Sequence, residues 1–412
     1  MATTYMHVLR GLNRNVRLYL LVHVFYGFAS FGVFAVVYNL YLLRLGYGPE
    51  TIGAMNSGTA LAYSLSALVA GTLGKKWGAH RVMWLGILVQ AAGYLGLPLA
   101  ESFPSSFRTA WLVGSGGLAS FGSSALLVNG DILLYAEAGE KGTGHALSIL
   151  LAIWGLTGFA GSLVAGELPT VLVQLLHLGS ASPAPYRYVL VLAGAVLTPG
   201  LVLVLLMKPG SPEQPGDLAT TSGRAPYGPI LLIAAIQLLV GAGYGSVTSF
   251  FNVYLAQSLH LATSGLGALM AVAQLLPVVV ALIAPVILSR WGNRRVYVWS
   301  TLATAACLLP LALVRHWAAA GAGYTGIMAL MRLYAPAFLL HRLELVKPDW
   351  RPVMNGAANM AFGLSLSGTA LAGGYTIATW GYPPFFLVAA ALTAAGAALF
   401  GICFRSRRAL TR

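Results

Sequence analysis

The sequence predicts an all-α membrane protein with twelve transmembrane helices, arranged as two pseudo-symmetric bundles of six. Of the 412 residues, 58% are hydrophobic and 8% are charged, whereas about a quarter of the residues of an ordinary soluble domain are charged. Apolar runs of about 20 residues, the length that a helix needs to cross a hydrocarbon layer about 30 Å thick, recur along nearly the whole chain. In addition, the two halves of the chain repeat several short motifs in the same order.

The apolar runs place the helices and divide the chain. The first run, from Leu18 to Leu43, is too long for a signal-peptide core and lacks a small-residue cleavage pattern, so we interpret it as a retained helix. The stretch from Lys208 to Tyr227 is rich in Pro, Gly and Ser and predicts a cytoplasmic linker between the halves. The predicted domains are a six-helix bundle over 1–207, the linker over 208–226 and a second bundle over 227–412. The predicted helices are 17–43, 50–74, 82–100, 108–136, 143–166, 187–207, 227–257, 262–289, 294–315, 317–341, 351–380 and 382–404.

The basic residues predict the orientation of the chain in the membrane. With the N-terminus inside, 19 of the 24 Lys and Arg residues fall in inner segments, four fall in outer loops and Arg332 falls within a span. Positive residues are retained on the cytoplasmic side, so both termini are expected inside a bacterial cytoplasmic (inner) membrane. The four outer residues are Arg44, Arg108, Arg187 and Arg315.

Three ordered matches indicate that the chain arose by duplication. Their offsets are 213, 214 and 208 residues, and duplicated halves are a common construction of transporters. The matched pairs are 38–42 with 251–255, 76–82 with 290–296, and 155–157 with 363–365.

The second of these matches resembles the hallmark loop of the major facilitator superfamily, a Gly-x-x-x-Asp-Arg-x-Gly-Arg-Arg pattern between helices two and three. Here the loop reads Gly71-Thr72-Leu73-Gly74-Lys75-Lys76-Trp77-Gly78-Ala79-His80-Arg81, and the second copy runs from Pro285 to Arg295. The resemblance implies the twelve-helix fold and secondary transport by alternating access. Lys75 and Ser289 stand where the family usually has an acid that helps to latch the two halves, so the departure bears on the latch and not on the fold. The implied conformational motif comprises Gly71, Lys75, Gly78, Arg81, Arg290, Gly292 and Arg294.

Glycines recur along the fifth predicted helix. This pattern resembles the glycine-rich stretch of the family's exporters, although the Gly-Pro pair of that stretch is missing. The physical alternative is close packing of helices through small residues. The glycines are Gly155, Gly158, Gly161 and Gly166.

Ionisable groups inside membrane spans are costly and therefore candidates for function. His23, Asp131 and Arg332 stand inside spans one, four and ten, and the resemblance implies that these helices, with helix seven, line a central cavity. Polar and aromatic side chains recur along the same helices at helical spacing, and such groups would be unsatisfied against lipid. The predicted cavity and coupling residues are His23, Tyr26, Ser30, Ser124, Asp131, Gln237, Tyr244, Thr248 and Arg332.

Two interpretations of these groups stay open. In the first, Asp131 or His23 takes up a proton, and Arg332 neutralises the carboxylate or binds an anionic part of the substrate. In the second, Asp131 is structural and pairs with Arg81 or Lys75, while His23 makes an interhelical hydrogen bond or snorkels towards the cytoplasmic surface. Trp154, Asn355 and Asn359 could also contact a ligand, although packing is the simpler role for them.

The sequence favours a transporter over other classes of protein. It contains no metal-ligand cluster, nucleophile elbow or phosphate-binding loop, so we expect neither an enzyme nor a cofactor, a metal or ATP. The basic residues lie in short loops, which excludes a nucleic-acid partner. We expect a monomer in the lipid bilayer that exports a lipophilic or amphipathic small molecule, coupled to protons. Uptake of a sugar or another small polar solute is the alternative, and a non-transporting receptor or scaffold of the same fold is a third reading.

Overall fold

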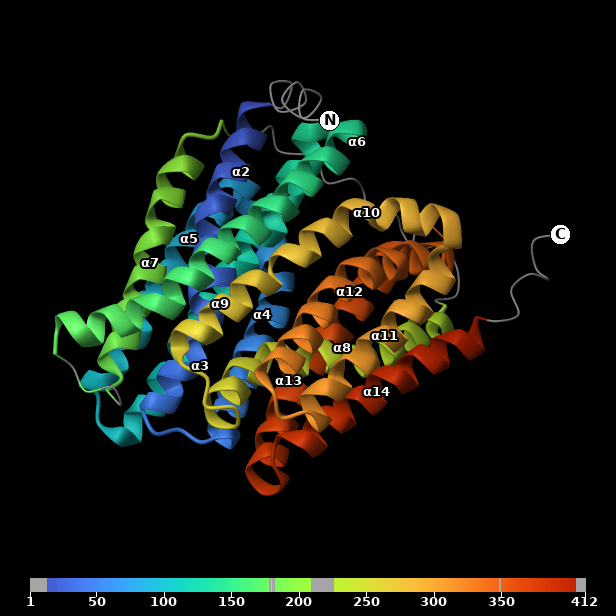
Figure 1. The fold of residues 1–412 in the computed structure, drawn as a ribbon. Coiled ribbons are helices and arrows are strands. Elements are labelled where there is room, and N and C mark those ends of the chain that lie inside the picture. The colour runs from blue at the N-terminus through green and yellow to red at the C-terminus, as the bar shows by residue number, and fades with distance from the viewer. Residues whose placement is uncertain (1–12, 178, 180–181, 209–225, 348–349, 405–412) are drawn as a thin grey trace. The chain divides into compact units, whose positions relative to one another are not determined.

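The computed structural model describes residues 13–404 except 178, 180–181, 209–225 and 348–349, and the side chains of 138–145 and Pro352 are not described. The described part is helical and contains no strand, and its long helices follow the predicted spans in order (Figure 1). The helices are α2 Arg14–Tyr26, η1 Gly27–Phe34, α3 Ala35–Arg44, α4 Pro49–Trp77, α5 Ala79–Gly96, η2 Leu97–Ser102, α6 Ser105–Leu175, α7 Ala184–Leu205, α8 Tyr227–Gln257, α9 Thr263–Ala273, α10 Leu275–Trp291, α11 Asn293–Leu313, α12 Trp317–Glu344, α13 Arg351–Trp380 and α14 Tyr382–Cys403.

Helix α6 covers two predicted spans without a break in its helical hydrogen bonding. It has 71 residues, so a straight α-helix of this length would be about 107 Å long, more than three times the thickness of the hydrocarbon layer. Its arms Ser105–Glu137 and Ala146–Leu175 are each long and apolar enough to cross a membrane. The segment therefore supplies spans four and five.

Nine helices of the described part are long and apolar enough to cross a membrane by length and composition. The remaining three predicted spans, α4, α12 and α13, have 29, 28 and 30 residues and are long enough as well. Polar residues dilute their apolar runs, such as Asn56 and Ser57 in α4 and Asn355 and Asn359 in α13. Together these helices account for twelve spans.

The chain forms two compact units. Unit 1 comprises Met1–Gly46, Ala62–Pro215 and Ala262–Ala271, and unit 2 comprises Tyr47–Leu61, Gly216–Leu261 and Val272–Arg412. The first part of α4 thus belongs to unit 2 and the first part of α9 to unit 1. The predicted domains, 1–207 and 227–412, divide the chain by sequence position and stay a prediction. The predicted linker lies outside the described residues apart from its ends at Lys208 and Pro226.

Each unit contains one short segment from the other half of the sequence, 262–271 in unit 1 and 47–61 in unit 2. A contact between two hydroxyl groups joins each segment to its unit. In unit 2 the Ser57 hydroxyl of α4 is 2.7 Å from the Ser367 hydroxyl of α13. In unit 1 the Tyr186 hydroxyl of α7 is 2.8 Å from the Thr263 hydroxyl of α9. These segments are therefore integral to the units that they join.

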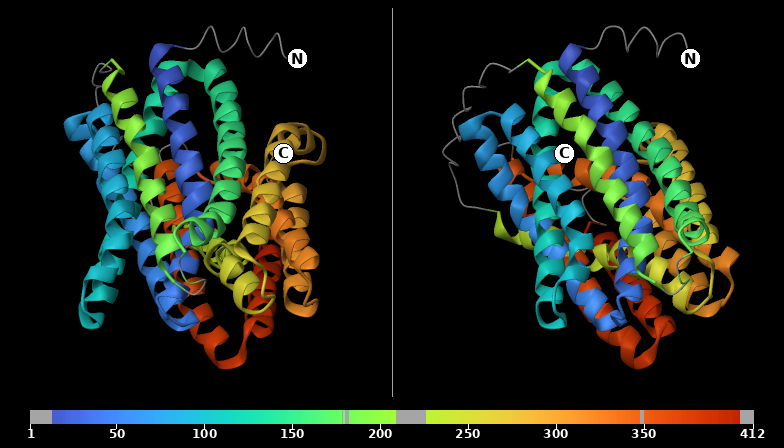
Figure 2. Two further views of the ribbon diagram at one scale, coloured as in Figure 1. Left: turned by 60° about the vertical axis from the view of Figure 1, so that its left-hand side comes forward. Right: turned by 90° about the vertical axis from the view of Figure 1, so that its left-hand side faces the viewer.

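Buried apolar side chains fill the interior of each unit. In unit 1, α2 and α7 lie side by side in both views of Figure 2, and Tyr19, Leu20 and Val189 are at most 4% exposed. In unit 2, buried residues of α11, α12 and α14 form an aromatic cluster that includes Tyr297, Phe338 and Phe400. These helices therefore contribute apolar faces to the interior of their units.

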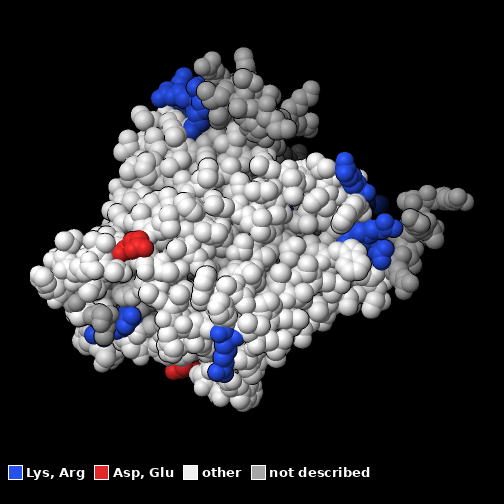
Figure 3. All heavy atoms as spheres, viewed as in Figure 1, with Lys and Arg blue, Asp and Glu red and all other residues white. Residues whose placement is uncertain are grey.

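The outer surface of the helices is apolar as well. Leu68, Leu175, Val279 and Leu313 are 64%, 69%, 54% and 68% exposed. The face drawn in Figure 3 shows separate groups of Lys and Arg and almost no acidic side chains across a broad uncharged surface. Such a surface suits hydrocarbon, in which a charged side chain is costly.

Candidate functional site

The first transmembrane helix contains a π-helical segment, η1, between α2 and α3. A π-helix bonds residue i to i+5, and such turns occur frequently at functional sites. The predicted recurrence of polar and aromatic side chains assumed ordinary α-helical spacing, whereas the wider π-turn changes the angular spacing across Gly27–Phe34. Tyr26 and Ser30, at the start of this segment, contact different helices.

Tyr26 and Ser30 both form hydrogen bonds inside unit 1. The Tyr26 hydroxyl lies 2.7 Å from the Ser123 hydroxyl of α6. The Ser30 hydroxyl accepts hydrogen bonds from the Gln90 amide at 2.9 Å and from the Tyr94 hydroxyl at 3.2 Å, both on α5. The Gln90 carbonyl oxygen is buried without a hydrogen-bond partner in the described part, so this polar network keeps one free acceptor.

His23 is fully buried beside this network. Its Nδ1 lies 2.9 Å from the Tyr19 carbonyl oxygen, and its Nε2 has no hydrogen-bond partner among the described residues. The His23 ring is 4.2 Å from the Tyr19 ring, 5.6 Å from the Tyr26 ring and 5.7 Å from the Trp154 ring, between centroids. Phe31 lies 5.1 Å from Trp154 and completes an aromatic cluster. The Trp154 indole N–H is also buried and without a partner in the described part.

Asp131 lies on the first arm of α6 and is exposed. Within the described part of the chain it forms no ion pair with Arg81 or Lys75. Its neighbour is Tyr19, whose hydroxyl is within electrostatic range and has no hydrogen-bond partner in the described part. Ser124, also on this arm, is fully buried and its hydroxyl likewise lacks a described partner. In unit 1, therefore, the Asp131 carboxylate lies near the Tyr19 side chain, and the Tyr19 ring in turn contacts the His23 imidazole.

Glu137, one and a half turns further along α6, has a structural role. Both Asn13 and Asn15 donate side-chain hydrogen bonds to its carboxylate, the latter at 2.7 Å. Asn15 also donates to the Lys208 carbonyl at 3.0 Å and accepts from the Lys208 amide at 2.9 Å. This cluster joins the start of α2, the end of the first arm of α6 and the first residue of the predicted linker.

Unit 2 contains the other four predicted cavity residues. Arg332 of α12 is partly buried and forms no hydrogen bond or ion pair within the described part of the chain. It lies within electrostatic range of Tyr244 on α8, whose ring stacks on Phe362 of α13 with centroids 6.0 Å apart and planes 28° apart. Gln237 is partly buried on the same face of α8, whereas the exposed Thr248 uses its hydroxyl on the Tyr244 and Gly245 carbonyls.

The two copies of the loop motif adopt the same local structure. Gly78 and Gly292 precede α5 and α11 with φ of 87° and 78°, a region that side chains rarely adopt. After each glycine, an equivalent side chain holds the end of the last helix of that half: His80 contacts the Val204 carbonyl, and Arg294 donates to the Gly401 carbonyl at 3.0 Å. Gly71 is partly buried, and the exposed basic residues of the motif are Lys75, Arg81 and Arg290.

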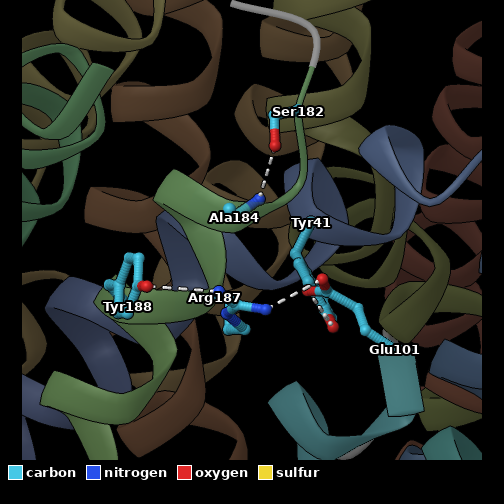
Figure 4. Close-up of polar contacts among 6 residues, drawn as sticks. All are labelled: Tyr41, Glu101, Ser182, Ala184, Arg187 and Tyr188. Atoms are coloured by element: carbon cyan, nitrogen blue, oxygen red, sulfur yellow. Dashed lines mark hydrogen bonds and ion pairs between the residues drawn. The ribbon is translucent and has the colours of Figure 1, made fainter. Parts of the chain in front are cut away.

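A polar cluster that was not predicted lies at the end of unit 1 where α3, η2 and α7 meet (Figure 4). Glu101 accepts hydrogen bonds from Tyr41 and Arg187, each at 3.1 Å. The Arg187 guanidinium also donates to the Tyr188 hydroxyl at 3.2 Å and lies 4.9 Å from the centre of its ring. The positive-inside count treated Arg187 only as an outer basic residue, and no spacing in the sequence indicates a partner 86 residues away.

The nine predicted cavity residues therefore divide between the units. His23 and Tyr26 lie together in unit 1, with Asp131 linked to them through Tyr19, and Tyr244 lies with Arg332 in unit 2. That these residues share one cavity stays a prediction. The sequence did not single out Tyr19, Gln90 or Ser123, since uncharged polar residues are common in membrane helices.

Comparison with known proteins agrees with this architecture. A family model described as Major Facilitator Superfamily matches residues 19–234 and 233–412. Uncharacterised MFS-type transporters of Burkholderia mallei (strain SAVP1) and Burkholderia pseudomallei (strain K96243) are each 30% identical to this chain over 382 residues, covering 89% of this chain and 86% of the relative.

Solved structures show the same fold. The nucleoside transporter NupG superposes with a TM-score of 0.73 at 15% identity, covering 95% of this chain and all of that chain. A D-xylose-proton symporter and a POT family transporter in complex with 5-aminolevulinic acid each give 0.72, at 12% and 14% identity, with 94% and 96% of the two chains covered. The predicted twelve-helix fold in two six-helix bundles is confirmed, and the expectation of a transporter rather than an enzyme is confirmed with it. The chain belongs to the major facilitator superfamily and is a multi-pass membrane protein that acts as a secondary transporter.

Proposed function

We propose that this transporter exports a lipophilic or amphipathic small molecule from the bacterial cytoplasm in exchange for protons, with both termini on the cytoplasmic side and one chain as the working unit. Asp131 and Arg332 carry the proposal, because each lies within a membrane span and neither forms an ion pair in the described part of the chain. An unpaired charge at this depth is costly unless it takes part in transport.

Asp131 is the proposed proton carrier. A carboxylate in a span can hold a proton when it faces hydrocarbon and release it when water or a cation approaches. The neighbouring Tyr19 and the buried His23 extend the polar path into unit 1, where the unbonded Nε2 of His23 is able to accept or donate a proton.

The predominantly apolar interior supports an amphipathic substrate. In unit 1 the aromatic cluster of His23, Tyr26, Phe31 and Trp154 offers ring faces and one unbonded indole N–H. Aromatic faces bind flat apolar groups well, and a single polar handle sets the orientation.

Uptake of a sugar or another polar solute is the second candidate. The Gln90 carboxamide favours it, because its carbonyl oxygen is unbonded while its N–H groups donate to the Ser30 and Tyr94 hydroxyls, and sugars bind to carboxamides and hydroxyls. The D-xylose-proton symporter of the same fold transports such a solute, although at 12% identity.

Proteoliposomes with an internal pH-sensitive dye test the proposal. With an imposed pH gradient, the predicted result is a change of internal pH that follows addition of an amphipathic compound and is absent from protein-free liposomes. Proton flux driven by sugars but by no amphipathic compound would replace export with the second candidate. A protein that moves no compound but captures a partner protein would favour a receptor or scaffold.

A further inference from the structure

We propose that the compound carried by this transporter is an organic anion with a flat, unsaturated body, and that a subsite of unit 2 centred on Arg332 recognises it. The inference deepens the proposed transport function and rests on it. The subsite comprises Arg332 of α12, Gln237 and Tyr244 of α8, and Asn359 and Phe362 of α13.

The first step is the depth of the Arg332 guanidinium. Arg332 precedes Glu344, the last residue of α12, by twelve residues, which is about 18 Å along the helix axis. In a hydrocarbon layer about 30 Å thick, this places Arg332 in its middle third. A guanidinium stays protonated in proteins, so its charge cannot be removed by loss of a proton.

The second step is that no acidic residue of unit 2 in the described part neutralises this charge. Those acids are Glu50, in the first turn of α4, and Glu344, at the end of α12. The Glu50 carboxylate folds back against Gly48, and Glu344 is exposed. Among its described residues, unit 2 therefore presents a cation without a counter-ion, which an anionic substrate would complement.

The third step is the character of the remaining polar groups. Two hydroxyls on these helices are used on backbone carbonyls: Thr248 on Tyr244 and Gly245, and Ser365 on Leu238 at 2.6 Å. The Tyr244 hydroxyl, in contrast, forms no hydrogen bond within the described part of the chain. Gln237 and Asn359 form no side-chain hydrogen bond to other described residues. The free groups are thus five guanidinium N–H donors, two carboxamides and the Tyr244 hydroxyl, among which donors outnumber acceptors, and this favours a ligand rich in acceptor atoms over a neutral polyol.

The fourth step is the shape of the apolar surface beside the cation. Tyr244 and Phe362 come from different helices and stack at 28°, and both are partly exposed. A planar ring gains offset-stacking energy on such a surface, whereas a saturated ring of similar size gains only the burial of its area. Guanidinium and rings together favour an aromatic carboxylate or a similar conjugated oxyanion.

The test measures equilibrium binding to the purified full-length protein in lipid nanodiscs. The probes are benzoate, 2-naphthoate and indole-3-acetate, each with its neutral alcohol and its amine as matched counterparts, and cyclohexanecarboxylate as a saturated anion. We expect at least one aromatic anion to bind at least tenfold more tightly than its alcohol, its amine and cyclohexanecarboxylate. If none of the aromatic anions exceeds its neutral counterpart, the proposal is overturned.

Variants assign the preference to the subsite. Arg332→Gln should remove the preference of at least tenfold for the anion, and Arg332→Lys should retain part of it, since a lysine keeps the charge but loses the bidentate geometry. Phe362→Leu should lower the preference for the aromatic over the saturated anion. Arg315→Gln, which removes the same charge from an exposed position, should leave binding unchanged. An anion preference that survives Arg332→Gln would contradict the assignment. If the Gln variant does not fold, an undiminished anion preference in Arg332→Lys would contradict it instead, because the lysine loses the bidentate geometry.

The outcome is separable from that of the proposed function. If neutral amphipathic compounds drive proton flux in liposomes and no anion preference exists, the transport proposal stands and this inference fails. If aromatic anions bind through Arg332 but no compound moves protons, the subsite stands and proton-coupled export fails.

Discussion

The contact between η1 and the second arm of α6 yields a quantitative prediction. A Cβ atom added at Gly161 would lie 2.4 Å from the Phe28 carbonyl oxygen and 2.9 Å from the Gly32 Cα. Ordinary contact begins at about 3.4 Å, so the two backbones must separate by about 1 Å to accept Gly161→Ala. Overpacking of this kind costs about 1–3 kcal/mol.

A matched control removes the effect of helix propensity. At Gly114, on the first arm of the same helix, an added Cβ meets nothing within 4 Å. Alanine gains about 1 kcal/mol over glycine in a helix at either position, so this gain cancels in the comparison. Gly161→Ala should therefore be less stable than Gly114→Ala by about 1–3 kcal/mol.

Unfolding by sodium dodecyl sulfate, followed by tryptophan fluorescence in one mixed-micelle system, measures this difference. Equal midpoints and slopes for the two variants would refute the backbone contact between η1 and α6. The same result would also remove the physical reason for a glycine at position 161.

Three further predictions concern the polar and loop elements. Asn15→Ala should destabilise unit 1 by about 2 kcal/mol, because the Glu137 carboxylate loses a buried donor, and it should speed hydrogen exchange at the Lys208 amide; unchanged exchange would contradict the anchoring role. Gly78→Ala and Gly292→Ala should each cost about 1–3 kcal/mol in the same unfolding assay, because alanine is strained at the positive φ of both positions. An added Cβ meets no neighbouring atom at either position, so backbone strain is the whole of the expected cost; a neutral effect at either position would contradict the strain argument. Replacing Glu101 and Arg187 singly and together should give a coupling energy below about 1 kcal/mol that falls in high salt, because their side chains are 22% and 33% exposed, and a larger, salt-independent coupling would show that the pair is effectively buried.

The helices were predictable because hydrocarbon imposes a minimum length and an apolar composition on every span. The sequence divided spans four and five at the polar residues from Glu137 to Lys141, which interrupt the apolar run, and α6 continues as a helix through this boundary. The duplication also indicated that Gly78 and Gly292 occupy equivalent turns, and both have positive φ.

Other features leave no local trace in the sequence. Hydrophobic periodicity does not distinguish the π-turn of η1 from an α-helix, because both bury a continuous apolar face. The exchange of 47–61 and 262–271 between the units depends on contacts over long sequence separation, such as Ser57 with Ser367. His23, Asp131 and Arg332 could be named because charge in hydrocarbon is conspicuous, whereas Tyr19 could not, since a tyrosine in a membrane helix is ordinary.

The role of Asp131 as proton carrier is the central claim, and transport by Asp131→Asn in proteoliposomes tests it most directly. The variant should lose accumulation of substrate against its gradient and substrate-driven proton flux, while exchange of labelled for unlabelled substrate continues, because the amide cannot take up or release a proton. Accumulation equal to that of the unaltered protein would contradict the account.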